Sequence, residues 1–469
     1  MAKSQRHWAE THKPQALRRS LRRLQLAGKA RGYEGEPLTD ASLTITTFVR
    51  RGSHLKPPAE PRSAAYDILE SISRGHSMER ALEGALDALS PRDRRLAHEI
   101  AAGTLRHRRI LDLTINQALT QPVKHLPPKV RNVLRIGTYQ IHYLDRVPAY
   151  AAVTASVDLA RLVGGERAAK LTNAVLRRVS RSPRYDVTQC TMAERYSHPD
   201  WLIGRWKKRF GRERTEQLLV HNNAKPSIIV QPVLRAQEEI RESFIEANVP
   251  FDLHPTGMGL RIRDSEVQQL PGYHEGAFIV QDPAQRMLLE YAAIPSGSMV
   301  WDVCAAPGGK AVTLAVRHRV MASDGSSERM ERLRENAERA ASELWLVGAD
   351  ATKPPVRPRT FDAVLVDAPC SATGTMARHP DARWSLSPKK IRNAVALQAV
   401  ILASVADAVK PGGLLVYLTC SLEKEENEEQ VDRFLEAHVE FERTGDDRAI
   451  FPADYGTDGG FGARMRRVK

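Results

Sequence analysis

The stretch GGLLVYLTCS, residues 412–421, shows most directly how the C-terminal part of the chain folds. A short apolar run that follows a Pro-Gly turn and ends in polar residues is typical of a buried strand. Cys420 stands where this strand should end. Because ligands of α/β sheets bind outside the carboxyl ends of the strands, we expect the Cys420 thiol to take part in chemistry.

Four more apolar runs precede this stretch, and helical segments separate them: residues 299–304, 319–324, 344–350 and 361–367. Strands that alternate with helices predict a parallel sheet with helices on both faces. We therefore expect an α/β domain of the Rossmann-like type over residues 276–469.

The preceding part of the chain predicts two smaller units. Apolar residues recur at helical spacing from residue 62 to about 182, and turn signals at Ser90-Pro91, Pro127-Pro128 and Gly164-Gly165 divide them. This pattern predicts an all-α domain over residues 58–183. Residues 184–275 show a β-α-β-β order after a helix, which predicts a linker module that contains a small α+β unit.

The helix expected near residues 201–210 carries aromatic and basic residues together. Such interleaving suits phosphate contact beside base stacking. For Trp201 and Trp206 we favour packing in the core, and for the basic residues we favour phosphate contact.

The charge distribution points to a polyanionic partner. The 469 residues carry a net charge of +14, and residues 1–57 hold 12 Lys and Arg against 4 Asp and Glu. A charge of this size favours nucleic acid. The first 57 residues predict a basic arm that contacts RNA backbone; a solvated tail or a misplaced start codon explains them equally well.

The remaining composition is that of a cytoplasmic globular protein. Hydrophobic residues make up 42% and charged residues 27% of the chain, and no apolar run has the length of a membrane span. The N-terminus carries no secretory signal pattern. Four scattered cysteines without a Cys-x-x-Cys pair indicate free thiols in a reducing compartment, with no metal site.

Acids and a glycine turn follow the predicted strands: Asp302 with Gly308-Gly309, then Asp324, Asp350 and Asp367. A tight glycine turn lets the backbone approach a ligand, and an acid after the second strand can accept both ribose hydroxyls. Each aspartate alone is more often a helix N-cap, but four in register favour a nucleoside cofactor.

The sequence around the glycine turn disfavours two common nucleotide-binding motifs. A P-loop needs Gly and Ser or Thr where this chain has Cys304 and Ala311, and Gly-x-Gly-x-x-Gly is absent. A mononucleoside donor such as S-adenosylmethionine fits better.

Two cysteines follow the last two parallel strands, Cys370 and Cys420. Methylation of a pyrimidine at C5 needs a thiolate that adds at C6, because C5 alone is too weakly nucleophilic. Asp367 would hydrogen-bond the cytosine edge and stabilise the adduct. For Cys304 and Cys190 we favour the role of a small buried hydrophobe.

The C-terminal domain resembles the RNA (cytosine-C5) methyltransferases of the Nop2/Sun group. The resemblance rests on four motifs: Asp302-Val-Cys-Ala-Ala-Pro-Gly-Gly-Lys310, Asp367-Ala-Pro-Cys-Ser-Ala-Thr-Gly374, Arg378-His-Pro380 with Trp384, and Thr419-Cys-Ser421 with Glu426-Asn427. The chain departs from this pattern at Ala372, where the group usually has glycine.

The helical domain is similar to NusB, through Gly103-Thr-Leu-Arg106, residues 131–137 and residues 171–177. A NusB-like domain before this methyltransferase domain is the arrangement of the bacterial Sun/RsmB-type 16S rRNA methyltransferases. The resemblance covers about residues 60–469.

The resemblance implies that S-adenosylmethionine is the methyl donor. It also implies that Cys420 is the nucleophile and that Cys370 serves product release, with Asp367 in contact with the base. The cofactor-binding residues that it implies are Cys304, Ala305, Ala306, Pro307, Gly308, Gly309, Lys310, Asp324, Asp350 and Asp367. DNA cytosine methyltransferases use a Pro-Cys cysteine as nucleophile, whereas two cysteines are the pattern of the RNA enzymes.

These features predict a monomeric cytoplasmic enzyme that methylates C5 of a cytosine in 16S rRNA or in a small-subunit assembly intermediate. Three alternatives stay open. They are methylation of another RNA (tRNA or 23S rRNA), a DNA cytosine methyltransferase, and an RNA-binding assembly or antitermination factor with an inactive methyltransferase domain.

Overall fold

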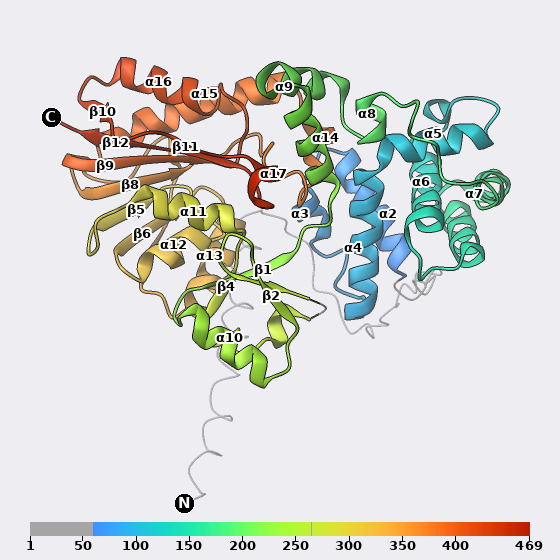
Figure 1. The fold of residues 1–469 in the computed structure, drawn as a ribbon, viewed down its shortest axis with the longest axis horizontal. Coiled ribbons are helices and arrows are strands. Elements are labelled where there is room, and N and C mark those ends of the chain that lie inside the picture. The colour runs from blue at the N-terminus through green and yellow to red at the C-terminus, as the bar shows by residue number, and fades with distance from the viewer. Residues whose placement is uncertain (1–59, 264) are drawn as a thin grey trace, which may run out of the picture. The chain divides into compact units, whose positions relative to one another are not determined.

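The computed structural model describes residues 60–263 and 265–469 (Figure 1). The basic arm expected over residues 1–57 lies outside the described residues. Within the described part of the chain, no helix has the length and apolar character needed to cross a membrane.

The N-terminal part is helical, as predicted. Its helices are α2 (Pro61–Ser73), α3 (Met78–Leu82), α4 (Pro91–Arg106), α5 (Arg108–Ala118), η2 (Val123–His125), α6 (Pro128–Tyr143) and α7 (Ala149–Val179). The Ser90 hydroxyl accepts the Asp93 N–H and caps α4. α7 is interrupted at Gly165, whose φ is 72°. The apolar faces of α2, α4, α5, α6 and α7 meet in one core that includes Ile68, Ile100 and Leu176.

The linker module consists of three α-helices, a short 3-10 helix and a small antiparallel sheet. Its elements are α8 (Met192–Arg195), α9 (Asp200–Asn223), β1 (Ile228–Pro232), α10 (Gln237–Glu246), β2 (Phe251–Leu253), β3 (Leu260–Ile262) and η3 (Val267–Gln269). The sheet has the order β2-β3-β1-β4. β4 (Phe278–Val280) lies beyond the boundary expected at residue 275, but it pairs with β1 because Phe278 completes the small core around Phe244.

The C-terminal domain contains the five expected parallel strands. They are β5 (Met299–Asp302), β6 (Arg319–Asp324), β7 (Leu344–Gly348), β8 (Phe361–Asp367) and β9 (Val409–Thr419). The sheet order is β10-β12-β9-β8-β5-β6-β7, with β11 (Arg448–Ile450) paired to β12. β10 (Phe441–Arg443) and β12 (Gly460–Arg467) run antiparallel, so the sheet is mixed, and the five predicted strands form its parallel part.

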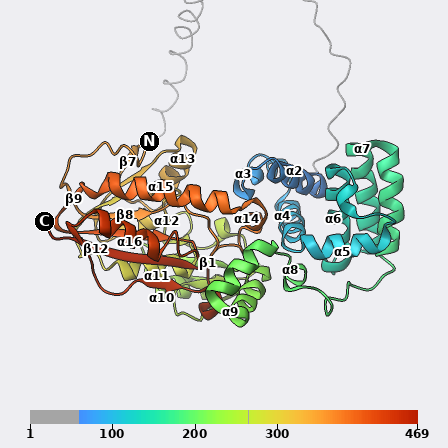
Figure 2. The ribbon, with the colours of Figure 1, turned by 90° about the horizontal axis from the view of Figure 1, so that it is seen from above.

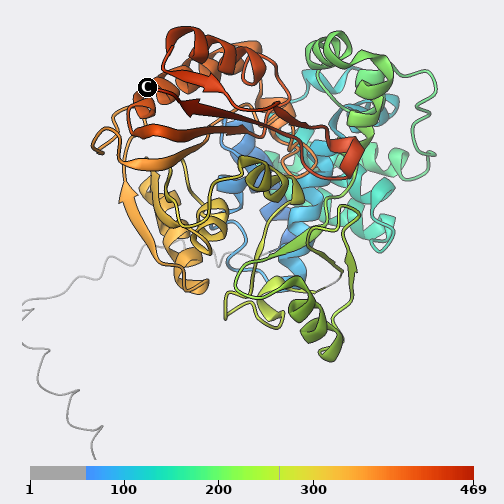
Figure 3. The ribbon, with the colours of Figure 1, turned by 60° about the vertical axis from the view of Figure 1, so that its left-hand side comes forward.

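Helices cover both faces of this sheet, because residues of each strand alternate between two cores. Val364 and Val366 pack with α15 (Pro388–Ala406) and α16 (Glu428–Ala437), whereas Leu365 packs on the other face. The helices of that face are α11 (Pro283–Ala292), α12 (Gly309–Ala315) and α13 (Ser327–Arg339). Figure 2 looks onto the side that carries α15 and α16, and Figure 3 shows helices on both sides of the strands. The short helices α14 (Ala382–Ser385) and α17 (Pro452–Tyr455) lie in the loops.

Candidate active site

The two predicted thiols lie side by side. β8 and β9 are parallel neighbours, with Asp367 opposite Leu418, so their carboxyl ends meet. Cys370 and Cys420 follow these ends, and their Sγ atoms are 3.0 Å apart. Cys190 lies before α8, where its thiol contacts the Asp186 carbonyl oxygen at 3.9 Å. The structure thus brings together the two cysteines for which the sequence predicts chemistry.

The environment of the thiols determines where the protons reside. The hydrogen bond with Cys420 and then burial raise the pKa of Cys370 well above its usual value. Cys370 therefore keeps its proton and can donate it in a hydrogen bond to Cys420. Burial and then the Asp302 carboxylate raise the pKa of Cys304 to about 12, so that this thiol also stays neutral.

Lys310, in the first turn of α12, pairs with the acid at the end of β8. Its Nζ donates to Asp367 Oδ2 at 2.6 Å, and the residue is only 9% exposed. Burial acts to lower the pKa of Lys310, but the charge of Asp367 and the hydrogen bond to it outweigh burial and raise this pKa. Further attraction comes from Asp302 and Cys420. A lysine that remains charged thus faces the acids and one of the thiols.

The loop of residues 304–310 is a tight turn held against β6. The Ala305 N–H donates to the Ser323 carbonyl at 2.9 Å, and the Gly308 N–H donates to the Ala305 carbonyl at 2.7 Å. Gly308 has φ 105°, and a Cβ there would lie 2.5 Å from Leu333 Cδ1. Glycine is therefore required at this position.

Two buried carboxylates near this loop have unused acceptor atoms. Asp302 is 0% exposed, and neither of its oxygens has a hydrogen-bond partner among the described residues. Asp324 is 2% exposed; its Oδ1 accepts from Ser326 and Arg329, but its Oδ2 has no such partner. Burial and then repulsion from Asp367 raise the pKa of Asp302 to about 8.

Unsatisfied buried acceptors indicate a missing donor. S-adenosylmethionine carries ribose hydroxyls and an ammonium group, which are donors of the required kind, so the residues present fit this cofactor. Asp350 differs, because it is exposed and caps a turn by accepting from the N–H and hydroxyl of Thr352. These hydrogen bonds lower the pKa of Asp350.

A buried glutamate that we did not single out holds the two cysteine loops together. Glu426 is 0% exposed. It accepts the Ser371 N–H at 2.8 Å, the Ser421 hydroxyl at 2.5 Å and the Gln398 side-chain amide at 3.1 Å. Burial raises its pKa, although these hydrogen bonds oppose the rise. The sequence gives Glu426 only as part of the motif Glu426-Asn427. Nothing in its neighbouring residues indicates that its side chain faces another loop.

The basic helix of the linker module binds protein carboxylates. Arg205 pairs with Glu423 and Glu425, which follow Cys420, and Trp206 Nε1 donates to Glu423 Oε1 at 3.0 Å. Arg209 pairs with Glu428 at 3.0 Å. The expected phosphate contact therefore does not hold for these two arginines. Trp206, at 0% exposure, is a core residue as we favoured.

Comparison with known proteins agrees with this geometry. Residues 291–466 match the family described as 16S rRNA methyltransferase RsmB/F, and residues 59–181 match the NusB family. The chain is 35% identical over 402 residues to the probable ribosomal RNA small subunit methyltransferase B of Synechocystis sp., which covers 81% of this chain and 90% of that protein. It is also 35% identical over 414 residues to ribosomal RNA small subunit methyltransferase B of Vibrio cholerae, with 85% and 95% covered.

Solved structures share the fold. The crystal structure of PH0851 superposes with a TM-score of 0.74 at 25% identity, covering 87% of this chain and 98% of that one. NSun6 from Pyrococcus horikoshii superposes with a TM-score of 0.52 at 18% identity, covering 58% of this chain and 98% of that one, which shows the fold alone. The relatives are matched over nearly their whole length, and the predicted resemblance is confirmed at the level of the family. The chain belongs to the RsmB/F family of 16S rRNA methyltransferases, with a NusB-family domain before its methyltransferase domain.

Proposed function

We propose that the chain transfers a methyl group from S-adenosylmethionine to C5 of a cytosine in 16S rRNA, with Cys420 as the nucleophile. The observation that carries this proposal is the pair of thiols 3.0 Å apart, beside the Lys310–Asp367 ion pair. A carboxylate held by a lysine can meet the polar edge of cytosine while a thiolate attacks its ring.

The residues of the site divide the reaction between them. The Cys420 thiolate adds to C6, and the electron pair of the C5–C6 double bond becomes available at C5. Bound S-adenosylmethionine supplies the methyl group that C5 takes up. Asp367, fixed by Lys310, hydrogen-bonds the N3/N4 edge and stabilises the adduct. Loss of the C5 proton to a base then expels the Cys420 thiolate, and Cys370, which keeps its proton, assists this release.

The cofactor is assigned to the carboxyl ends of β5, β6 and β7. Cys304 to Lys310 would hold it through their backbone, Asp324 would accept its ribose hydroxyls, and Asp350 would meet the adenine. Asp302 has two free buried oxygens, which suit its ammonium group. The target cytosine must leave its stack to reach the thiols.

A methyl-transfer assay on unmodified small-subunit RNA tests the proposal. Cys420→Ala should abolish formation of 5-methylcytosine. Cys370→Ala should accumulate a covalent enzyme–RNA adduct on a denaturing gel, because attack persists while release fails. Cys190→Ala, a change in the linker module, should leave both readouts unchanged. Activity that survives in Cys420→Ala but is lost in Cys370→Ala would assign attack to Cys370 instead.

The RNA target needs a separate test. Bisulfite sequencing of ribosomal RNA from a strain that lacks this protein should show one 16S rRNA cytosine without its methyl group. Loss of a methyl group from tRNA or 23S rRNA would redirect the proposal to that RNA. No methyl transfer together with tight RNA binding would favour an assembly factor. We further propose that the enzyme acts in the cytoplasm and that it is a monomer. Sedimentation of the full chain would test the monomeric state.

A further inference from the structure

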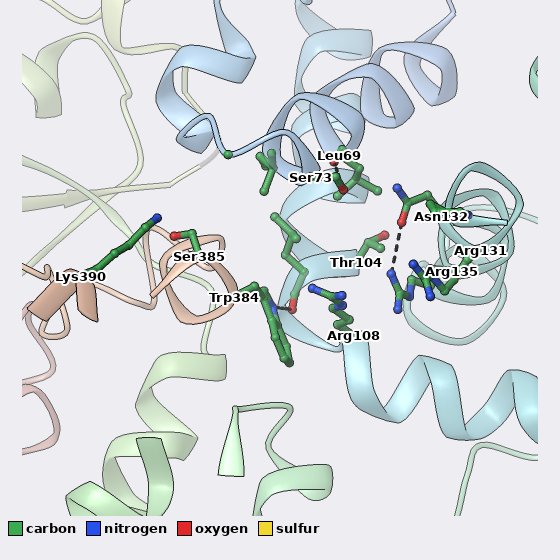
Figure 4. Close-up of a pocket in the computed structure, with 14 residues that line it drawn as sticks. Leu69, Ser73, Thr104, Arg108, Arg131, Asn132, Arg135, Trp384, Ser385 and Lys390 are labelled. Carbon is green, nitrogen blue, oxygen red and sulfur yellow. Dashed lines mark hydrogen bonds between the residues drawn. The ribbon is translucent and has the colours of Figure 1, made fainter. Parts of the chain in front are cut away.

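A cavity of about 470 Å³ lies where the helical domain meets the segment that leads into α15 (Figure 4). Helices α2, α4, α5 and α6 form one side of it, and α14 and the start of α15 form the other. This cavity is distinct from the site of the two thiols. Its polar lining includes Thr104, Arg108, Arg131, Asn132, Arg135 and Lys390.

The charges around the cavity are unbalanced. Arg135 is neutralised by Asp112, with both hydrogen bonds at 2.7 Å, and Asn132 donates to Glu70 at 2.9 Å. Arg108, Arg131 and Lys390 form no ion pair within residues 60–263 and 265–469. Burial first and repulsion from Arg135 second lower the pKa of Arg108 to about 10. The guanidinium still carries its charge at neutral pH. Asp112 is the acid that attracts both Arg108 and Arg131, so the described lining carries more positive than negative charge.

Two polar atoms at the cavity have no partner in the described structure. Thr104 is 2% exposed, and its Oγ1 makes no hydrogen bond, not even to its own helix. Arg131 Nε is likewise buried and unpaired. An unsatisfied buried group is costly and requires an explanation. An anionic ligand with several acceptor oxygens would satisfy both atoms and offset the cations.

Trp384 forms a rigid wall of the same cavity. Its Nε1 donates to the Leu105 carbonyl at 2.8 Å, and the Arg108 guanidinium lies 4.8 Å from the ring centroid. Leu69 and Ile72 add apolar surface. Figure 4 shows the arginines and Trp384 around one space, with Lys390 on the opposite side from the arginines. A lone inorganic anion does not require such an apolar wall.

We propose that this cavity binds one nucleotide of the RNA strand, with the phosphate on Arg108, Arg131, Lys390 and the Thr104 hydroxyl, and the nucleoside against Trp384. Its volume of about 470 Å³ lies within the range of roughly 300–1,000 Å³ for small organic ligands. Guanidinium groups match phosphate oxygens in geometry, and phosphate contacts position a strand without reading its sequence.

The cavity is coupled to the thiols through α15. Lys390 lies in the first turn of this helix, and Gln398 of the same helix donates to the Pro369 carbonyl beside Cys370 at 3.0 Å. A nucleotide held at the cavity would therefore keep a fixed register to the nucleophile. This inference rests on the proposed function, because it takes the substrate to be RNA.

Thr104→Val is the sharpest variant, because it exchanges only the unpaired hydroxyl for a methyl group of similar size. We expect an unchanged or higher Tm, since an unsatisfied buried group is removed, together with RNA affinity weaker by about 3- to 10-fold. A lower Tm with unchanged RNA affinity would show that the hydroxyl serves the fold, and would overturn its assignment to the ligand.

The cations are tested by the double variant Arg131→Gln/Lys390→Gln in the full chain, with Arg392→Gln as the matched control. Arg392 is exposed on the same helix and does not line the cavity. Binding of a labelled, unmodified 16S rRNA fragment is measured over a salt series. The double variant should lose about tenfold or more in affinity, and the slope of log K against log salt should fall by about 0.7–1.

The control should change neither quantity. The single-turnover methylation rate at saturating RNA should stay at the wild-type value in Arg392→Gln. If the double variant binds RNA with the wild-type affinity and the wild-type salt slope, the inference about the cavity is overturned. The proposed function is not affected by this result. If the wild-type protein binds RNA in a way that depends on the cavity residues but transfers no methyl group, the proposed function is refuted. The same result would support the cavity as an RNA-binding site.

A free nucleotide carries the same phosphate and nucleoside groups and is the other ligand that the cavity could bind. Calorimetric titration with cytidine 5′-monophosphate separates the two, because a strand nucleotide gains affinity from neighbouring contacts that a free one lacks. We expect the free nucleotide to bind at least about 100-fold more weakly than the RNA fragment. Tight binding of the free nucleotide, with RNA affinity insensitive to Arg131→Gln/Lys390→Gln, would identify a small-molecule site instead.

Discussion

Replacing Asp302 with asparagine should stabilise the cofactor-free protein at alkaline pH. The side chain is 0% exposed, both its oxygens lack partners in the described structure, and Asp367 and Asp324 repel its charge. Its pKa rises from 3.8 to about 8. At about 1.4 kcal/mol for each pKa unit, the cost of the charged form is at most about 6 kcal/mol.

The direction of the pH dependence follows from this shift. A carboxyl group with a raised pKa in the folded state favours folding when protonated, and this contribution is lost as the pH rises from about 4 to about 8. Wild-type stability should therefore fall relative to Asp302→Asn by at most about 1.4 kcal/mol per pH unit over this window. Above pH 8 the difference should be constant.

Urea unfolding without cofactor, at pH 5, 6.5 and 8, measures the difference between wild type and variant. Asp145→Asn, at an exposed position, is the control and should show no such trend. The variant should also bind S-adenosylmethionine about 10- to 100-fold more weakly by calorimetry, because a charged hydrogen bond to the ammonium group is lost. A difference in unfolding free energy that does not grow between pH 5 and pH 8 would refute the assignment of a buried, unpaired carboxyl.

Four further substitutions, at three positions, test the loops that carry the thiols. Gly374→Ala places a Cβ 2.7 Å from the Gly459 carbonyl oxygen, so Tm and methyl transfer should both fall. Ala372 has φ 54°, where the resembling enzymes usually have glycine; Ala372→Gly should therefore raise the unfolding free energy by about 1 kcal/mol in urea. Glu426→Gln keeps one oxygen for the two serine hydroxyls but turns an NH2 group toward the Ser371 N–H and the Gln398 amide, so it should lower Tm, and Glu426→Ala should lower both Tm and kcat.

The parallel strands and the helical domain follow from the sequence because their signals are local. Both faces of β8 are buried, so residues 361–367 are mostly apolar, and this apolar run is visible in the local sequence. For the same reason, acids and thiols placed at strand ends could be predicted to lie at one edge of the sheet. Residues such as Asp324, Cys370 and Cys420 needed no knowledge of strand order, since all carboxyl ends of a parallel sheet lie at one edge.

The contacts between distant segments are decided only by the tertiary structure. Arg205 lies in a basic stretch of the kind that often contacts phosphate. In the folded protein, however, α9 packs beside the loop after Cys420, and the carboxylates of that loop pair with Arg205. Arg108 resembles any helical surface arginine until Trp384, from another domain, closes over it. The periodicity of apolar residues along the chain indicates which residues are buried. It does not indicate which distant residues pack against them. The sequence therefore predicts which residues stand at the strand ends, whereas the pairing of the loops and the cavity beside Trp384 arise only when the domains pack.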